Sequence, residues 1–301
     1  MKPIVPDTNL YCINVGNFLN TWVYNNEDIC FLVDPGPSNT TNLLKENLDS
    51  LKIGNKDLDY ILLTHVHVDH AGGVGKLLNF FPQSKVICHP KGIKHLINPK
   101  KLWEGSLKVL GKEAEYYGKI DPVPEDRILS LKTIHNGEIK VVETLGHAPH
   151  HQSYIFKYFL FIGEACGHNY PSEKAIFIRP ATPPIFDYDI YISSLQKLLK
   201  LDLSGFKICF PHFGMRDNAA MIIKIAQDQI KTWLKVINSF YNERNQPKFM
   251  EHLFTELLKV DKIYSNLKLL DKEIQLREPF IMRQSIAGII GYIEKKRKYT
   301  S

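Results

Sequence analysis

Four side chains that commonly bind metal ions lie within six residues of the chain: His65, His67, Asp69 and His70. They follow residues 60–63 (YILL), a continuous apolar run that predicts a short strand covered on both faces. A chain leaving such a strand can hold positions i and i+2 on one side, which allows two imidazoles to converge on one ion. The next two residues, Asp69 and His70, are then placed to reach a second ion. Imidazole and carboxylate ligands together suit zinc, and also iron or manganese.

The apolar pattern predicts the elements that position these residues. Strands are expected at residues 18–24 and 29–33 as a hairpin, and at 60–63, 84–88, 127–131, 139–145, 153–157, 159–163 and 207–210. Helical patterns occupy 74–81 and 91–117. A further helix should run from an Asp187 cap to about residue 200, with an apolar face of Ile190, Leu195, Leu198 and Leu199.

Two segments differ from this alternating pattern. The proline-rich stretch 179–184 (RPATPP) is expected to be an ordered loop, because proline supplies no backbone donor. From residue 218 onward only helical patterns occur, at roughly 218–242, 248–260 and 280–297. The sequence therefore predicts an α/β catalytic domain of residues 1–217 and a helical C-terminal extension of residues 218–301.

Residues 64–73 (THVHVDHAGG) resemble the signature of the metallo-β-lactamase superfamily. Further stretches resemble the remaining motifs of that family in the family's order: Asn20-Thr21 with residues 33–36 (VDPG), 145–149 (LGHAP), 161–165 (FIGEA) and 210–214 (FPHFG). The resemblance covers residues 10–214 and is strongest to the glyoxalase II-like branch. It implies a four-layer αβ/βα sandwich that carries a metal site on one rim of its sheets.

The resemblance also implies a ligand set of seven residues. A first metal would be bound by His65, His67 and His147, and a second by Asp69, His70 and His212, with Glu164 in the bridging position. The family normally has an aspartate where this chain has Glu164, whose side chain is one methylene longer. Glu164 would therefore bridge from a shifted backbone, bind one metal only, or act from outside the coordination sphere.

Five other polar residues lie near these motifs in the sequence. His150, His151, His168 and Tyr170 either orient the ligands or simply face solvent. Arg179 and the proline loop either line a substrate entrance that holds an anionic group or have a structural role.

The chemistry expected of such a site is hydrolysis. Zinc lowers the pKa of a bound water from 15.7 to about 7, which supplies hydroxide at neutral pH, and Asp69 is the residue expected to orient it. No G-x-S-x-G motif occurs, which argues against a serine nucleophile. We therefore expect a cofactor of one or two divalent ions, zinc with iron or manganese as alternatives, and a small ester, thioester or lactone as substrate.

The sequence is compatible with two other functions. One is an RNA or phosphodiester hydrolase whose C-terminal helices, with their basic end at 294–298 (EKKRK), bind nucleic acid. The other is a mono-iron sulfur oxygenase. The di-iron members of the superfamily carry glutamate at the second ligand position, where this chain has His67, which argues against that type.

Composition restricts the partners and the compartment. The net charge of +6 and the pI of about 8.8 are mild, so we do not expect a nucleic-acid partner. The five cysteines are isolated and odd in number, as in a reducing compartment. No signal peptide or membrane span is evident, which predicts a cytoplasmic protein. The C-terminal helices would close the substrate cleft or form a homodimer.

Overall fold

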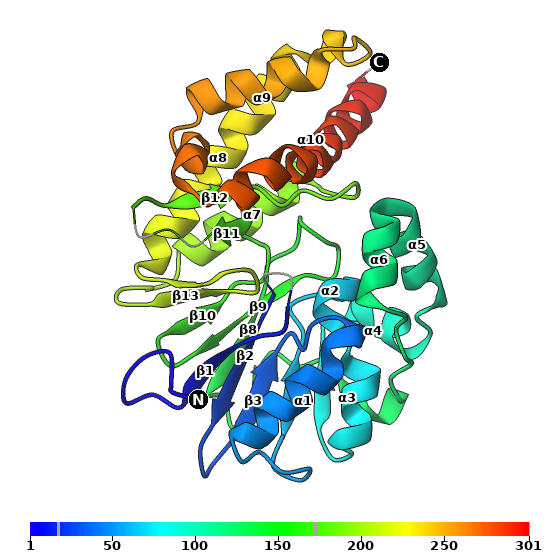
Figure 1. Ribbon diagram of the computed structural model, residues 1–301, viewed down its shortest axis with the longest axis vertical. Coiled ribbons are helices and arrows are strands. Elements are labelled where there is room, and N and C mark those ends of the chain that lie inside the picture. The colour runs from blue at the N-terminus through cyan, green and yellow to red at the C-terminus, as the bar shows by residue number, and fades with distance from the viewer. Residues whose placement is uncertain (17–18, 171, 173, 301) are drawn as a thin grey trace. The chain divides into compact units, whose positions relative to one another are not determined.

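The computed structural model describes residues 1–16, 19–170, 172 and 174–300. The chain divides into two compact units. Unit 1 comprises Met1–Glu143, His150–Gly163 and Cys209–Gly214, and unit 2 comprises Thr144–Pro149, Glu164–Ile208 and Met215–Ser301. Figure 1 shows helices α1–α6 of unit 1 in blue to green and helices α8–α10 of unit 2 in yellow to red.

The first sheet of unit 1 has the strand order β1-β2-β3-β4-β5-β6. Its strands are β1 (Leu10–Asn14), β2 (Asn20–Asn25), β3 (Cys30–Val33), β4 (Tyr60–Leu62), β5 (Lys85–Ile87) and β6 (Ile128–Leu129). The strands β1, β2 and β3 pair antiparallel, whereas β3 through β6 pair parallel. Because β4 lies inside this sheet, the segment that follows it starts from a fixed position. This segment carries the predicted ligands His65, His67, Asp69 and His70 and is called the ligand loop.

A second sheet has the order β14-β13-β10-β9-β8-β7. Its strands are β7 (Thr133–Ile134), β8 (Ile139–Glu143), β9 (Gln152–Phe156), β10 (Phe159–Phe161), β13 (Lys207–Phe210) and β14 (Gly214–Arg216). The strands β7 to β10 form an antiparallel meander. The strands β13 and β14 belong only in part to unit 1. That part is Cys209–Gly214, which includes the end of β13 and the start of β14.

The first sheet is covered on both faces. Its helices are α1 (Thr41–Ser50), α2 (Val68–Ala71), α3 (Val74–Phe80), α4 (Pro90–Ile97), α5 (Lys100–Leu110) and α6 (Lys112–Tyr117). Val23, Leu32 and Ile61 belong to a buried core that also includes side chains of α1 and α3. On the other face, the ring of Phe31 meets Phe156 of the second sheet with centroids 5.1 Å apart. Helix, sheet and sheet thus form three successive layers in unit 1.

Unit 2 is mostly helical. It contains a small antiparallel sheet of β11 (His168–Tyr170) and β12 (Phe177–Arg179), and the helices α7 (Tyr188–Leu199), α8 (Ala219–Ser239), α9 (Phe249–Val260) and α10 (Lys272–Thr300). Helix α8 contacts α7, α9 and α10 (Figure 1). The buried Trp233 of α8 donates its indole N–H to Asp261 Oδ2 at 2.8 Å, which ties α8 to the end of α9.

Most of the predicted elements are confirmed. The hairpin forms from β2 and β3, although Phe18, at the predicted start of the first strand, lies outside the described residues. The strand 60–63 appears as β4 and the helix 74–81 as α3. Asp187 caps α7 as expected, accepting a hydrogen bond from the Ile190 N–H at 3.3 Å.

Three details of the prediction are wrong. Ile190 is 45% exposed, because the buried stripe of α7 runs through Tyr191, Leu195 and Leu198. Arg179 is the last residue of β12, so the loop begins at Pro180. Helix α10 begins at Lys272 and contains Pro279, whereas the prediction started the helix after that proline.

The division at residue 217 into a catalytic domain and an extension stays a prediction. Among the residues that the structure describes, no helix has the length and the apolar character needed to cross a membrane. All five cysteines are free thiols, four of them buried.

Candidate metal centre

Asp34, the residue after β3, fixes the start of the ligand loop. One of its oxygens, Oδ1, accepts the Thr64 backbone N–H at 2.8 Å, and Oδ2 accepts the Thr64 hydroxyl at 2.6 Å. Its backbone has φ +53, and its carbonyl accepts the Thr21 hydroxyl at 2.8 Å. The two motif residues Thr21 and Asp34 therefore act together as a clamp on the residue before His65.

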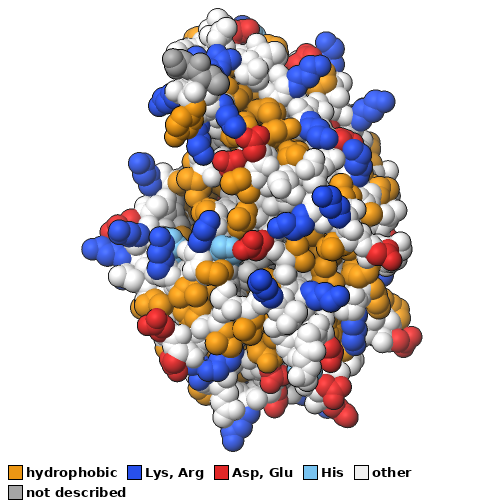
Figure 2. Space-filling model, turned by 180° about the vertical axis from the view of Figure 1, so that it is seen from behind, with side chains coloured by type: hydrophobic (Ala, Val, Ile, Leu, Met, Phe, Trp, Pro, Cys, Tyr) orange, Lys and Arg blue, Asp and Glu red, His pale blue; other side chains and the backbone are white. Residues whose placement is uncertain are grey.

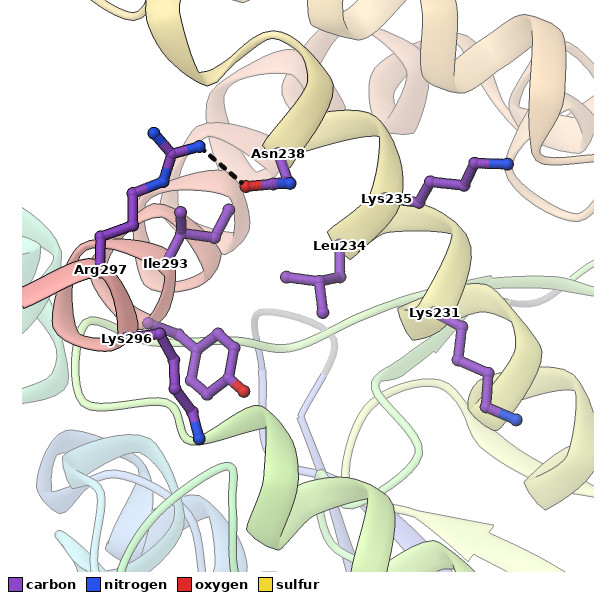
Figure 3. Close-up of a pocket in the computed structure, with 8 residues that line it drawn as sticks. Lys231, Leu234, Lys235, Asn238, Ile293, Lys296 and Arg297 are labelled. Atoms are coloured by element: carbon purple, nitrogen blue, oxygen red, sulfur yellow. Dashed lines mark hydrogen bonds between the residues drawn. The ribbon is translucent and has the colours of Figure 1, made fainter. Parts of the chain in front are cut away.

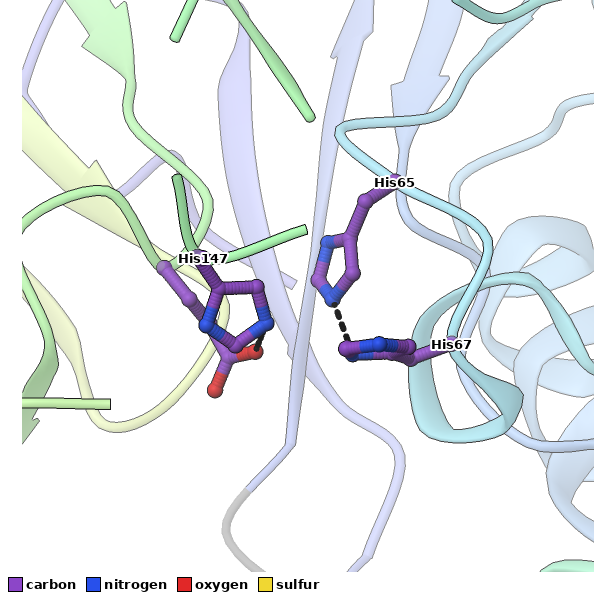
Figure 4. A group of neighbouring side chains, drawn as sticks. His65, His67 and His147 are labelled. Atoms are coloured by element: carbon purple, nitrogen blue, oxygen red, sulfur yellow. Dashed lines mark hydrogen bonds and ion pairs between the residues drawn. The ribbon is translucent and has the colours of Figure 1, made fainter. Parts of the chain in front are cut away.

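This clamp determines which nitrogen of His65 is available. Because the Thr64 hydroxyl donates to Asp34, its oxygen accepts from His65 Nδ1, 3.0 Å away. The Nε2 lone pair of His65 is then left to bind an ion, and Nε2 faces His67 Nδ1 at 3.0 Å (Figure 4). Two nitrogens bound at about 2.1 Å to one tetrahedral zinc would be about 3.4 Å apart. The pair is close to that arrangement.

A second group of donors forms around Asp69. One ligand atom each of Asp69, His70 and His212 lies within 4.8 Å of the others. Asp69 Oδ2 is 3.4 Å from His70 Nε2 and 4.0 Å from His212 Nε2. Asp34 Oδ2 lies 3.1 Å from His70 Nδ1, so it accepts that N–H and leaves Nε2 on the side of Asp69.

The electrostatics of this group favour a cation. Burial opposes a charge on His70, but the carboxylates of Asp69 and Asp34 outweigh it and hold the pKa of that imidazole well above its usual value. His70 itself is 1% exposed. Two carboxylates around a buried ring concentrate negative potential at the point where the three donor atoms meet.

His212 is positioned by Asn20, the first residue of the motif series. The Asn20 backbone N–H donates to the Pro211 carbonyl at 2.7 Å. With its amide oxygen turned toward the loop, Asn20 accepts the backbone N–H groups of Phe213 and Gly214 at 2.9 and 2.7 Å. Asn20 thereby fixes the backbone on both sides of His212.

In unit 2, His147 and Glu164 form a buried pair. His147 Nδ1 donates to the Ala181 carbonyl at 2.9 Å, and its Nε2 lies 2.7 Å from Glu164 Oε2. The preceding Gly146 has φ +123, and a Cβ there would lie 2.4 Å from the Tyr191 backbone, so only glycine fits. Because Nδ1 of His147 carries the proton donated to Ala181, Nε2 is the nitrogen available to a metal.

The other oxygen of Glu164, Oε1, contacts His168 Nε2. Burial favours the neutral acid, but His147 and then His168 outweigh it and hold the pKa of Glu164 well below its usual value. The carboxylate is 4% exposed and ionised. Both of its oxygens therefore face imidazoles, Oε2 that of His147 and Oε1 that of His168.

His150 and His151 lie inside unit 1 and are buried, which excludes the surface position left open for them. The ring of His151 lies 5.1 Å from that of His65, between centroids, and a Cβ on Gly163 would come within 2.5 Å of His151 Nε2. His150 Nδ1 accepts the Val66 N–H at 3.4 Å. Both rings support the ligand loop.

Five of the seven predicted ligands thus lie in unit 1 and two in unit 2, and each set makes contacts inside its own unit. The sequence prediction missed the orienting roles of Asn20, Thr21, Asp34 and Thr64, although all four belong to the family motifs. The contact between His168 and Glu164 had only a weak signal, their spacing of four residues.

These donor sets fit divalent metal ions. Neutral imidazole nitrogens and carboxylate oxygens are the ligand types that zinc takes. In His65, His70 and His147, Nδ1 makes the orienting hydrogen bond, and Nε2 faces the other donors. Histidines that bind metals are commonly oriented in this way.

The comparisons with known proteins agree with this interpretation. The sequence pattern of the Metallo-beta-lactamase superfamily matches residues 15–204. A metallo-beta-lactamase fold-containing protein of Sulfurisphaera tokodaii is 31% identical over 186 residues, 59% of this chain and 67% of that protein. A hydroxyacylglutathione hydrolase of Aliivibrio salmonicida is 27% identical over 197 residues, 61% of this chain and 73% of that enzyme.

Similarity of fold extends further than similarity of sequence. The crystal structure of a metallo-beta-lactamase family protein of Thermus thermophilus has a TM-score of 0.63 at 19% identity, covering 97% of this chain and 94% of that one. The fold and the His, Asp and Glu cluster place the chain among the metallo-hydrolases. It belongs to the metallo-β-lactamase superfamily.

Proposed function

We propose that this protein is a zinc-dependent hydrolase of thioesters, esters or lactones. The observation that carries the proposal is the donor group of Asp69, His70 and His212. Asp69 and His70 follow His65 and His67 directly in the chain, and His212 lies between β13 and β14. We propose the full ligand set as His65, His67 and His147 for a first ion and Asp69, His70 and His212 for a second, with Glu164 as the seventh ligand.

When bound, zinc lowers the pKa of water to about 7 and stabilises the negative charge that develops on a carbonyl oxygen. Residues of the chain orient the water molecule and the ligands. The Asp69 side chain is 19% exposed, so its carboxylate is accessible to a water molecule and can accept a hydrogen bond that orients it. Asp34 and Thr64 keep the ring nitrogens of His65 and His70 turned toward the ions.

The substrate class is supported by similarity to hydroxyacylglutathione hydrolases at 26–32% identity. Thioesters suit a site without an assigned general acid, because a thiolate leaves without prior protonation. Oxygen esters and lactones with stabilised leaving groups belong to the same class.

The test is a panel of thioesters, lactones, esters and phosphodiesters, assayed after elemental analysis of the purified protein. We expect bound zinc, thioester or lactone hydrolysis, loss of that activity with a chelator and its return when Zn²⁺ is added. Hydrolysis that persists without metal contradicts the proposal. Iron as the native metal, together with oxygen uptake in the presence of a thiol, supports the sulfur oxygenase instead.

One feature favours phosphodiester hydrolysis as a second candidate. A groove of about 350 Å³ lies between α8 and α10 in unit 2 (Figure 3). Its cationic lining residues are Lys231, Lys235, Lys296 and Arg297. Some of this charge is offset inside the protein, because Lys296 pairs with Asp189 at 2.5 Å and Arg297 bonds Asn238 at 3.2 Å. Figure 2 shows basic side chains interspersed with acidic ones on the face that it presents.

This second candidate predicts cleavage of RNA that is lost when Lys231 and Lys235 are both changed to Glu. The same substitutions should leave hydrolysis of a small thioester unchanged. If no nucleic acid is cut by the zinc-loaded protein, this candidate is rejected.

A further inference from the structure

The loop that follows Arg179 lies directly on α10. The Ser285 hydroxyl of α10 donates to the Pro180 carbonyl at 2.7 Å, and the Thr182 hydroxyl donates to the Ser285 carbonyl at 2.6 Å. One turn further along α10, a Cβ on Gly288 would lie 2.1 Å from the Thr182 carbonyl oxygen. The helix and the loop are therefore packed backbone against backbone at this point.

This loop reaches a proposed metal ligand through one bond. Between Pro180 and Thr182, the Ala181 carbonyl accepts the His147 Nδ1–H at 2.9 Å. That bond fixes the ring orientation and leaves Nε2 for the ion. A shift of the loop would move the acceptor away from His147 without touching any ligand.

Arg179 makes a second connection, to Glu164. Its Nη1 donates to Ser285 Oγ and its Nη2 to His168 Nδ1, both at 2.6 Å. Because His168 Nδ1 accepts from arginine, which is only a donor, His168 Nε2 carries the proton that faces Glu164. Arg179 thus fixes the tautomer in which His168 Nε2 donates to Glu164 Oε1. The other oxygen of Glu164, Oε2, faces His147.

The arginine is itself anchored to α10 by a buried ion pair. Arg179 Nε lies 3.0 Å from Glu278 Oε1, and Tyr170 donates to Glu278 Oε2 at 3.2 Å. The Nε and Oε1 atoms are close without the alignment of a hydrogen bond, so the contact is electrostatic. Burial opposes the charge of Arg179, but Glu278 outweighs it and raises the pKa of the guanidinium above its usual value. Buried pairs contribute little net stability, so a positional role explains this one better.

We propose that α10 positions the metal ligands of unit 2: Ser285 and Gly288 hold the loop that orients His147, while Arg179 with Glu278 orients Glu164 through His168. Arg179, Ser285 and Glu278 are positioning residues on this account. The inference rests on the proposed metal centre and adds that Glu164 offers one oxygen, Oε2, to it.

Two glycines of the same helix provide a matched test. A Cβ on Gly288 meets the Thr182 and Pro183 carbonyl oxygens at 2.1 and 2.5 Å, whereas a Cβ on Gly291 would be 3.6 Å from the nearest atom, the Pro184 carbonyl oxygen. Both changes to alanine raise helix propensity by about 1 kcal/mol. We expect Gly288→Ala to weaken zinc binding by about 10- to 100-fold in a chelator competition, and Gly291→Ala to leave it within about twofold.

The variants are also compared by the absorption spectrum of the Co²⁺-loaded protein and by thermal unfolding without metal. A changed cobalt spectrum in Gly288→Ala, with the spectrum preserved in Gly291→Ala, is expected. Equal zinc affinity and identical spectra in the two variants overturn the inference. If the unsubstituted protein binds no metal, the proposed function falls first and this inference with it, so the two failures are distinguishable.

Two milder substitutions test the same inference if Gly288→Ala does not fold. Ser285→Ala removes only the hydroxyl that contacts Arg179 and Pro180, and Arg179→Lys keeps the charge opposite Glu278 but loses the fork that reaches His168. Both should fold and lower zinc affinity by about threefold to tenfold, less than the roughly 10- to 100-fold typical of removing a direct orienting partner, because they act through a second residue. Unchanged zinc affinity in both overturns the inference.

Discussion

In unit 1 the proposed ligands of the loop after β4 are oriented from the neighbouring strand. Asp34 reaches Thr64 and His70 across 30 and 36 residues, from the strand next to β4. In unit 2, Arg179 and Pro180 reach Ser285 of α10 across 106 and 105 residues. The first arrangement is built into adjacent strands, whereas the second requires the C-terminal helix to be folded against the loop. Changes far from any ligand should therefore disturb the ligands of unit 2 more than those of unit 1.

The largest effect is expected from removing a ligand in either unit. His65→Ala and His147→Ala should each lose bound zinc and lower kcat/KM about 10³-fold or more, which corresponds to about 4 kcal/mol of transition-state stabilisation. His252→Ala, on the exposed surface of α9, is the control and should change neither quantity. Full zinc content in both ligand variants would refute the assignment.

The role of Asp34 in the clamp is tested by comparing Asp34→Asn with the same substitution at Asp59. Asp34→Asn replaces acceptors of the Thr64 and His70 hydrogens, and should lower zinc affinity about 10- to 100-fold and stability by about 2 kcal/mol. Asp59→Asn changes a carboxylate that accepts the Cys30 N–H at 2.8 Å and touches no ligand. It should cost stability only, measured by urea unfolding. Equal zinc affinity in the two variants would contradict the role of Asp34.

Glu164→Asp tests the role of the longer side chain. Aspartate is one methylene shorter, so from the same backbone its carboxylate is drawn back from His147 and His168, and at least one contact should be lost. We expect zinc affinity to fall about threefold to tenfold in isothermal titration, with the fold retained. Glu164→Gln keeps the length and removes the charge, and it should weaken zinc binding at least as much. Tighter zinc binding by the aspartate variant would show that the extra methylene has no positioning role.

The smallest effect concerns thiol reactivity, which reports on both units. Burial raises the pKa of Cys30 and Cys88 to about 12, and burial also raises the pKa of Cys166 in unit 2. Only the thiolate reacts, so labelling of the native protein by iodoacetamide should be slow at pH 8 and rise about tenfold per pH unit. Gly167, the neighbour of Cys166, packs against the backbone of Arg179 and Pro180. In Gly288→Ala, Cys166 should therefore be labelled faster and Cys30 at an unchanged rate, as read by mass spectrometry. Equal acceleration at both would indicate a general loss of stability.

The ligand loop of unit 1 was predictable because its residues are local. The run 60–63 indicates the strand, and the spacing of His65, His67, Asp69 and His70 indicates the chemistry. The motif of residues 33–36 pointed to Asp34, but its bonds to Thr64 and His70 depend on β3 pairing with β4, which spacing alone does not give.

The contacts between Arg179 and α10 in unit 2 could not be predicted in the same way. Arg179 stood in the sequence beside a proline-rich stretch, with a substrate entrance and a structural role both open. Its partners Glu278 and Ser285 are about a hundred residues away in a helix whose start was placed too late because of Pro279. Long-range ion pairs depend on tertiary packing, for which the apolar pattern carries no signal.

The most direct test of the central claim is a crystal structure of the zinc-loaded protein with anomalous data collected at the zinc edge. We predict an anomalous peak about 2.1 Å from Nε2 of His65, Nδ1 of His67 and Nε2 of His147, with a second beside Asp69, His70 and His212. No peak among these histidines, or a zinc bound elsewhere on the chain, would contradict the account.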